Sequence, residues 1–379
     1  GGAVTPPMGW RSWNLFGSHV NQSLMQDMMD EISSRRNLVD GVLTSLSDLG
    51  FTDVGLDDGW QACGNYGYAN YTYHSASGVY PIVNQTRFSD FIEMTSYAHE
   101  RNLTAGWYLN NCICKDHCTD DVCYQGDAAA LLSYNFDSVK LDNCGTQRDL
   151  NLWSNLFSAS INDQTKPIII ENCHWGHTLP NKTWCPFHFY RSSQDIKPYF
   201  TSVLYNLESV FPLADANLSN PSCWAYPDML EIGVANFTQA EARSHYAAWA
   251  IISSPLTLSL DLRNHSLVDS LWSIIANPEI IAINQAWAGF SGSRFLFINS
   301  SSAIVQFLYK PIIYNLSTAV LIMNLAHFTV SNLTLSFDSV PSLPCLSLCQ
   351  VRDVFLRSDL GIFNSSFSIP SIEPHDSYF

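Results

Sequence analysis

Acid and amide side chains recur where short apolar runs of the sequence end. Most are carboxylates, which serve enzymes as acids, bases and nucleophiles. If the runs are parallel barrel strands, their carboxyl ends bring these groups to one face, where barrel enzymes keep their active sites. Helix N-caps in the following loops would explain one or two of them, but not the whole set. The residues concerned are Asp57, Asp58, Asn110, Asp142, Asp195 and Asp228.

The run SVKLDNC from Ser138 to Cys144 places Lys140 two residues before Asp142. Side chains alternate between the faces of a strand, so both would point into the barrel mouth. A cation at that spacing favours the ionised carboxylate that a nucleophile requires. The Lys-x-Asp pattern is common in proteins, so it indicates a nucleophile only if the two residues lie on a barrel strand.

The run YRSSQD places Asp195 four residues after Arg191, in the loop beyond another strand. From there Asp195 can approach Asp142 across the barrel mouth. One ionised and one protonated carboxyl group form the apparatus of glycoside cleavage. Taken alone, the Arg-x-x-x-Asp spacing more often marks a surface ion pair.

The elements that would position these residues alternate between strands and helices as far as residue 290. This predicts an α/β fold, a (β/α)8 TIM barrel over residues 1–290, with an open doubly wound sheet as the alternative. The strands are expected to end near Asn14, Asp58, Asn110, Asp142, Cys173, Arg191, Asp228 and Leu260. The helices are expected at 24–49, 88–101, 127–134, 150–161, 198–210, 239–252 and 267–275. Short strands with Ser, Asn and Pro turns then predict a C-terminal antiparallel β-sandwich domain over residues 291–379.

The 379 residues carry a formal net charge of −16. This balance repels nucleic acid and anionic membranes, so neither is expected as a partner. No apolar run reaches the ~18 residues of a membrane span. A neutral small molecule or glycan is the expected ligand, without a cofactor or a metal. The sequence does not decide the oligomeric state, for which a homodimer is one option.

Eleven cysteines are many for a cytosolic enzyme, and Cys112, Cys114, Cys118 and Cys123 form a cluster. Disulfides are the favoured interpretation and a zinc site the alternative. Because the count is odd, at least one thiol is free or intermolecular. Twelve Asn-x-Ser/Thr acceptors predict N-linked glycans on a secreted, lysosomal or vacuolar protein whose signal peptide has been removed. They are Asn21, Asn70, Asn84, Asn102, Asn181, Asn217, Asn236, Asn264, Asn299, Asn315, Asn332 and Asn364.

Seven stretches resemble, in order, the motifs of glycoside hydrolase family 27. They are PPMGWRSWN (6–14), LDDGW (56–60), VKLDNC (139–144), RSSQD (191–195), PDMLE (227–231), WAIISSP (249–255) and NPEIIAINQ (277–285). This family contains α-galactosidases and α-N-acetylgalactosaminidases on a barrel followed by a β-sandwich. The resemblance implies a retaining exo-glycosidase that removes terminal α-linked galactose by double displacement.

The resemblance also assigns roles to individual residues. Asp142 would be the nucleophile and Asp195 the general acid/base. It further implies that Cys144 forms a disulfide with Cys112 or Cys114. Adjacent carboxylates at 57 and 58 suit the 4- and 6-hydroxyls of galactose, because a sugar without them leaves an acceptor unpaired. The expected sugar contacts are Trp13, Asp57, Asp58, Tyr108, Lys140, His174, Arg191 and Asp228.

Some positions depart from the family pattern. Arg11 replaces a usual Asn, Gly59 replaces a usual Cys, and NQAWAG (284–289) differs from the common N-Q-D ending. His174 stands where α-galactosidases carry a Glu that holds the sugar's 2-hydroxyl. A histidine leaves no room for an acetamide but can bond a hydroxyl, which favours galactose. The alternatives are an α-N-acetylgalactosaminidase, a β-L-arabinopyranosidase, an α-glucan hydrolase or a non-catalytic glycan-binding protein.

Overall fold

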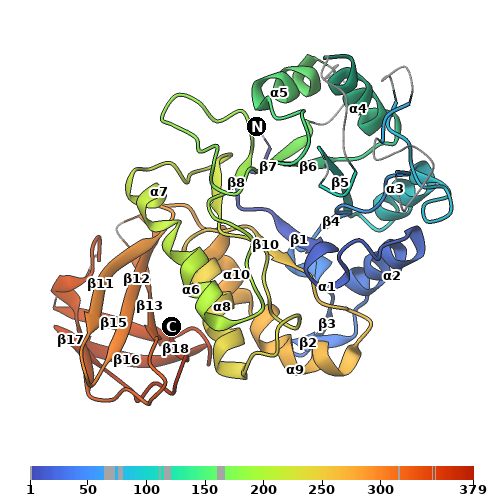
Figure 1. Cartoon of the computed structure of the whole chain (residues 1–379). Helices are drawn as coiled ribbons and strands as arrows, with labels where there is room; N and C mark the ends of the chain where they lie inside the picture. Colours follow the sequence, from blue (N-terminus) through green and yellow to red (C-terminus); the bar gives the residue numbers. More distant parts are fainter. Residues whose placement is uncertain are drawn as a thin grey trace.

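The N-terminal part of the chain forms a sheet of eight parallel strands in the computed structural model (Figure 1). Most of their residues are buried, as expected when helices cover one face and side chains fill the other. The strands are β1 (Met8–Arg11), β4 (Asp53–Gly55), β5 (Thr104–Leu109), β6 (Ser138–Asp142), β7 (Ile169–Cys173), β8 (Phe189–Arg191), β9 (Trp224–Tyr226) and β10 (Leu256–Leu258). The structure describes residues 2–63, 73–75, 80–110, 112–114, 121–159, 167–314, 316–343, 345 and 347–379.

The sheet curls until its last strand returns to its first. Gly9 of β1 lies opposite both Thr257 of β10 and Asp53 of β4. A side chain at Gly9 would place its Cβ 2.0 Å from the Asp53 carbonyl oxygen, so only glycine permits this approach. After β9, the Leu230 N–H donates to the Thr257 carbonyl at 2.9 Å and brings the chain to β10. The predicted barrel is therefore confirmed, and the open doubly wound sheet is wrong.

Helices surround the sheet on its outer side, and several begin at side-chain caps. The Asp90 carboxylate, for example, accepts from the Ile92 and Glu93 N–H groups. The helices are α1 (Trp13–Phe16), α2 (Gln22–Ser33), α3 (Phe91–His99), α4 (Asp121–Ser133), α5 (Leu150–Ala159), α6 (Phe200–Glu208), α7 (Phe211–Asp215), α8 (Gln239–Ile251), α9 (His265–Ile275) and α10 (Pro278–Gln285). Within the described ranges no single helix has the length and apolar character of a membrane span, and only the bent pair α9–α10 meets that test, by length and composition alone.

The single helix predicted over residues 24–49 is wrong in its second half. Helix α2 ends at Ser33, and a hairpin of β2 (Asn37–Val39) and β3 (Val42–Thr44) follows. Asp40 and Gly41 connect these strands with φ angles of 52° and 79°. An Asp-Gly pair is a strong signal for a two-residue hairpin turn, because both central residues need positive φ. That signal outweighed the helical spacing of the apolar residues.

The C-terminal part is made of antiparallel strands packed as two layers around their own core. The short strands expected here are present, and they include an exposed hairpin of β15 and β16, whose apolar residues do not alternate clearly. The strands are β11 (Ser293–Asn299), β12 (Ile304–Ile313), β13 (Ser317–Asn324), β14 (Leu333–Ser336), β15 (Leu348–Asp353), β16 (Ser358–Asn364), β17 (Ser366–Ile369) and β18 (Ser377–Tyr378).

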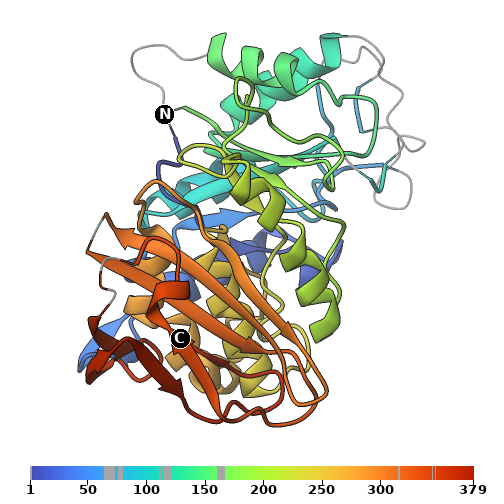
Figure 2. The same ribbon diagram turned by 90° about the vertical axis from the view of Figure 1, so that its left-hand side faces the viewer.

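Strands β12 and β13 of the C-terminal part pack against helix α8 of the barrel (Figure 2). Leu308, Leu321 and Phe379 of the C-terminal part belong to the same apolar cluster as the barrel helices. The buried Lys310 ammonium donates to the carbonyls of Ile283 and Asn284, the latter at 2.9 Å, near the end of α10. Burial lowers the pKa of Lys310 well below its usual value. The sandwich is therefore fixed to the barrel by apolar packing and by the hydrogen bonds from the Lys310 side chain to the carbonyls near the end of α10.

The cysteines form disulfides rather than a zinc site. The pairs in the described residues are Cys63–Cys114, Cys112–Cys144, Cys185–Cys223 and Cys345–Cys349. Cys123 is also disulfide-bonded, and Cys118 lies outside the described residues. Cys173 is a buried free thiol. The zinc alternative is thus wrong, and Cys112 is the partner of Cys144.

Candidate active site

A pocket of about 660 Å³ opens at the carboxyl ends of the barrel strands. Its volume lies in the range of ~300–1,000 Å³ that is usual for small-ligand sites. The structure brings nine of the ten predicted site residues to its wall, from six different strand ends or the loops behind them. These residues are Trp13, Asp57, Asp58, Tyr108, Lys140, Asp142, Arg191, Asp195 and Asp228.

Asp142 is the last residue of β6, and two donors fix its carboxylate. The Tyr108 hydroxyl donates to Oδ2 at 2.8 Å, and the Asn143 N–H donates to Oδ1 at 2.7 Å. Burial raises the pKa of Asp142, while Lys140 and Tyr108 oppose that rise. The result is a buried carboxylate with a fixed direction, which is what a nucleophile needs.

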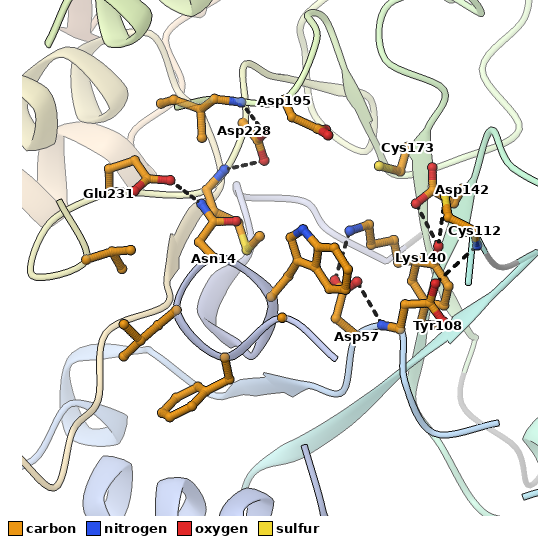
Figure 3. A pocket seen from close by; sticks show the side chains of 18 of the residues that line it. Asn14, Asp57, Tyr108, Cys112, Lys140, Asp142, Cys173, Asp195, Asp228 and Glu231 are labelled. Atoms are coloured by element: carbon orange, nitrogen blue, oxygen red, sulfur yellow. Dashed lines mark hydrogen bonds and ion pairs between the residues drawn. The ribbon is translucent and has the colours of Figure 1, made fainter. Parts of the chain in front are cut away.

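Asp57 and Lys140 form a buried ion pair beside Asp142. The Lys140 ammonium donates to Asp57 Oδ2 at 2.8 Å, and both side chains are almost fully buried. Figure 3 shows this pair next to the Tyr108–Asp142 contact. The pair places a cation and a carboxylate next to one another, where they can bond adjacent hydroxyls of a ligand.

Asp58 has a different environment from its neighbour. Its Oδ2 accepts the N–H groups of Cys112 and Ile113, each at 3.1 Å, and its Oδ1 accepts the Gly59 N–H at 2.9 Å. Burial raises the pKa of Asp58 to about 6, although these donors oppose it. Asp58 therefore holds the loop after β5 as well as lining the pocket.

Gly59 explains one departure from the family pattern. Its φ is 111°, and a Cβ there would lie 2.9 Å from the Cα and the carbonyl oxygen of Ser18. A cysteine at this position would need a different backbone path. The glycine is thus a consequence of how closely the loop after β4 approaches Ser18.

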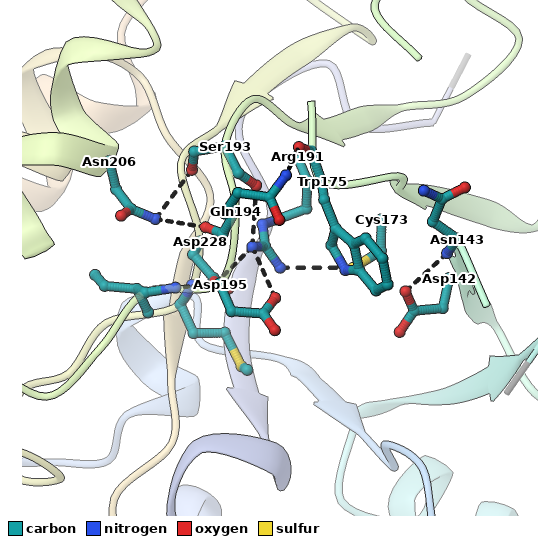
Figure 4. A network of polar contacts seen from close by, with 12 residues as sticks. Asp142, Asn143, Cys173, Trp175, Arg191, Ser193, Gln194, Asp195, Asn206 and Asp228 are labelled. Carbon is teal, nitrogen blue, oxygen red and sulfur yellow. Dashed lines mark hydrogen bonds and ion pairs between the residues drawn. The ribbon is translucent and has the colours of Figure 1, made fainter. Parts of the chain in front are cut away.

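Arg191 is the centre of the opposite wall. Its Nη2 lies 3.1 Å from Asp195 Oδ1 and 2.8 Å from Asp228 Oδ2, and its Nη1 donates to Cys173 Sγ at 3.5 Å. The Asp195 side chain is 53% exposed, whereas Asp228 is buried. Figure 4 shows the carboxylates of Asp195 and Asp142 facing one another across the pocket, below Trp175.

His174 does not line the pocket, which corrects the expectation for this residue. Along β7, the side chains of Glu171 and Cys173 point into the barrel. Because successive side chains alternate between the two faces, the side chain of the next residue, His174, points away from the barrel interior. Its ring Nδ1 lies 2.9 Å from the Thr178 hydroxyl. Burial lowers the pKa of His174 to about 4, so the ring is neutral.

Other residues of the pocket wall were missed from the sequence as ligand contacts, among them Asn14, Cys173, Trp175 and Glu231. Cys173 and Trp175 flank His174 and both line the wall. Strand alternation at β7 could have found Cys173. Glu231 lies at the other end, where the Asn14 amide donates to its Oε1 at 2.6 Å. Burial raises the pKa of Glu231 to about 7.

The sulfur atoms of Cys112 and Cys144 lie close to the Asp142 carboxylate. Both sulfurs are bonded to one another in a disulfide. A disulfide sulfur is not the thiolate that binds zinc. This group of three residues therefore does not have the donor set of a metal site, and the disulfide instead braces the loop that follows Asp142.

Residues 5–286 match the family model described as Alpha galactosidase A. This stretch is most of the chain and includes every strand and helix that builds the pocket. The chain belongs to this family. The resemblance to glycoside hydrolase family 27 is confirmed.

Relatives of the α-galactosidase family cover the chain to different extents. The alpha-galactosidase of Cyamopsis tetragonoloba is 29% identical over 302 residues, which are 76% of this chain and 66% of that protein. The probable alpha-galactosidase of Dictyostelium discoideum is 26% identical over 389 residues, 98% of this chain and 90% of that protein. The solved alpha-galactosidase of Saccharomyces cerevisiae with raffinose has a TM-score of 0.83 at 19% identity, covering 100% of this chain and 97% of that one. This last likeness shows the shared fold. The family and its curated relatives make the chain a glycoside hydrolase.

Proposed function

We propose that this glycoside hydrolase removes terminal α-linked galactose from glycans with retention of configuration. The observation that carries the proposal is the pair of carboxylates that face one another across the pocket, Asp142 and Asp195 (Figure 4). One is buried and held by two donors, and the other is half-exposed at the mouth. This asymmetry matches a nucleophile and a group that exchanges protons with a leaving group or with water.

In the first step Asp142 attacks the anomeric carbon, and the bond to the leaving oxygen breaks as Asp195 gives that oxygen its proton. The sugar is then bound covalently to Asp142 through the opposite face. In the second step Asp195 takes a proton from water, and the water oxygen displaces the Asp142 carboxylate. Two inversions give net retention. Tyr108 and Asn143 keep the attacking oxygens in place throughout.

Asp57, Asp58 and Lys140 support galactose as the sugar. They form a cluster of donor and acceptor groups opposite Arg191. The axial 4-hydroxyl and the 6-hydroxyl of galactose can both form hydrogen bonds with this cluster. A sugar with an equatorial 4-hydroxyl would leave a buried acceptor unpaired, at a cost of ~1–3 kcal/mol. The exposed face of Trp13 suits the C–H face of the ring. Cys173 and Trp175, rather than His174, take the wall beside the 2-hydroxyl.

The proposed compartment is the secretory pathway or a lysosomal or vacuolar lumen. Its support is the set of disulfides, which form and persist in oxidising compartments, together with the exposed Asn-x-Ser/Thr acceptors. N-linked glycans are part of the same proposal.

The decisive experiment follows the first product of p-nitrophenyl α-D-galactopyranoside by proton NMR. The α-anomer of galactose should appear before mutarotation produces the β-anomer. Early β-anomer would refute retention. A wild-type enzyme that cleaves the matching N-acetylgalactosaminide or α-glucoside faster than the galactoside would refute the sugar but leave the two carboxylate roles intact.

A further inference from the structure

A buried ion pair crosses the interior of the barrel beneath the pocket. Arg11 of β1 lies with its Nη2 3.1 Å from Glu171 Oε2 of β7, and the side chains are only 4% and 3% exposed. Strands β4, β5 and β6 separate β1 from β7 in the sheet. The pair therefore bridges the barrel rather than joining neighbouring strands.

Arg11 also approaches the wall of the pocket from below. Its Nη1 lies 3.9 Å from Asp57 Oδ2, the oxygen to which Lys140 donates at 2.8 Å. Arg11 itself does not line the pocket, and its Nη1 is buried without a hydrogen-bond partner. Burial opposes the charge of Arg11, yet Glu171 and Asp57 raise its pKa. Asp57 is thus the pocket residue that Arg11 approaches directly.

A glycine on a neighbouring strand leaves the space that the Arg11 guanidinium occupies. Gly55 of β4 lies directly against it, and a Cβ at Gly55 would be 2.9 Å from Arg11 Cζ and 3.1 Å from its Nε. The three nearest atoms to that Cβ all belong to the Arg11 side chain. Three strands therefore contribute matched residues to one arrangement, which a plain barrel core of apolar side chains would not need.

We propose that Arg11 and Glu171 are positioning residues that fix Asp57, and through it Lys140, against the 4- and 6-hydroxyls of galactose. This inference rests on the proposed function, because it assumes that Asp57 binds those hydroxyls. Asp57 would otherwise have one cation on one side, and its carboxylate could rotate toward Lys140. Because Arg11 lies below and Lys140 lies beside it, the Asp57 Oδ2 atom has two cations near it, and together they restrict that rotation. Glu171 balances the second buried cation, whose isolated charge would be costly.

The test uses three sugars as competitive inhibitors: galactose, its 4-epimer glucose, and 6-deoxygalactose. The main variant is the double substitution Arg11→Gln with Glu171→Gln, which leaves no buried charge unpaired. A second variant, Gly55→Ala, keeps every charge but displaces the guanidinium. Arg243→Gln, which removes a partly buried ion pair with Asp376 far from the pocket, is the control.

The wild type should bind galactose more tightly than either analogue. Both test variants should weaken the binding of galactose about tenfold and the binding of the two analogues less than about twofold. Only galactose makes every hydroxyl contact, so it loses most when Asp57 is displaced. The control should change the thermal midpoint without changing the ratios. The positioning role would be refuted if the binding of all three sugars were weakened equally, or if a folded double variant bound galactose as tightly as the wild type. A wild type that neither binds nor cleaves galactosides would instead refute the proposed function.

Discussion

The Tyr108 hydroxyl donates a hydrogen bond of 2.8 Å to the Asp142 carboxylate from the neighbouring strand. Tyr108 and Lys140 are direct register partners on β5 and β6, so the residue two positions later, Asp142, lies just above the ring. The bond stabilises the ionised carboxylate and is one of the forces that oppose the effect of burial on its pKa.

Tyr108→Phe should therefore raise the pKa of Asp142. Activity requires the ionised form and is lost as the pH falls through this pKa, so the acidic limb of the pH–kcat profile should move to higher pH. The lost bond to a charged group should also lower kcat/KM about tenfold or more. The exposed Tyr205→Phe is a matched control. An unmoved acidic limb would mean that Tyr108 does not act on the nucleophile.

The roles of the two carboxylates can be separated with azide. Asp142→Ala and Asp195→Ala should each lower kcat by roughly a thousandfold or more. With Asp142→Ala, azide replaces the carboxylate and attacks once, which gives β-galactosyl azide. With Asp195→Ala, azide attacks the covalent intermediate and gives α-galactosyl azide. NMR of the two products checks the assignment, which is reversed if the anomers are exchanged.

Sugar preference at the 2-position should depend on Trp175 and not on His174. Because His174 bonds Thr178 outside the pocket, His174→Ala should lower the free energy of unfolding by about one hydrogen bond, ~1 kcal/mol, and leave the preference unchanged. Trp175→Ala removes part of the pocket wall and should improve cleavage of N-acetylgalactosaminides relative to galactosides. Kinetics on both p-nitrophenyl substrates measure this ratio. A shift in the His174 variant alone would contradict the structure.

Stability should depend on the pH through Glu231. Burial raises the pKa of Glu231 from 4.5 to about 7, so the folded state holds the proton more tightly than the unfolded chain. The stabilisation is complete below pH 4.5 and is lost as the pH rises toward 7. Glu231→Gln should match the wild type near pH 4 and exceed it above pH 7 by about 2 to 3 kcal/mol. Urea unfolding at both pH values measures the difference, with the exposed Glu100→Gln as control. A constant difference would show that folding does not raise the pKa of Glu231.

Glycan attachment should avoid one acceptor. Asn70 and Asn315 lie outside the described residues, and among the other ten acceptors only Asn84 is buried, with 7% of its surface exposed. Its Oδ1 also accepts from the Thr86 hydroxyl at 2.7 Å. Peptide mapping after enzymatic removal of glycans should find exposed acceptors such as Asn299 modified and Asn84 unmodified. A glycan at Asn84 would require modification before this loop folds.

The sequence alone determined the features that depend on local order. Apolar runs followed by polar residues placed the eight barrel strands, because a parallel strand is buried along its whole length and ends at the active face. The spacings Lys140-x-Asp142 and Arg191-x-x-x-Asp195 gave the two carboxylates their cations, since neighbours along a strand or loop stay neighbours after folding.

Tertiary structure decided the features that depend on distant partners. The sequence could note that Arg11 is unusual, but only the closed barrel brings it to Glu171, 160 positions later along the chain. It offered Cys112 or Cys114 for Cys144, and only the folded loops select Cys112. His174 occupied the expected place in a motif, yet the pleat of β7 turns it away and presents Cys173 and Trp175. A motif fixes which residues follow one another, whereas the pleat and the curl of the sheet fix which side chains share a pocket.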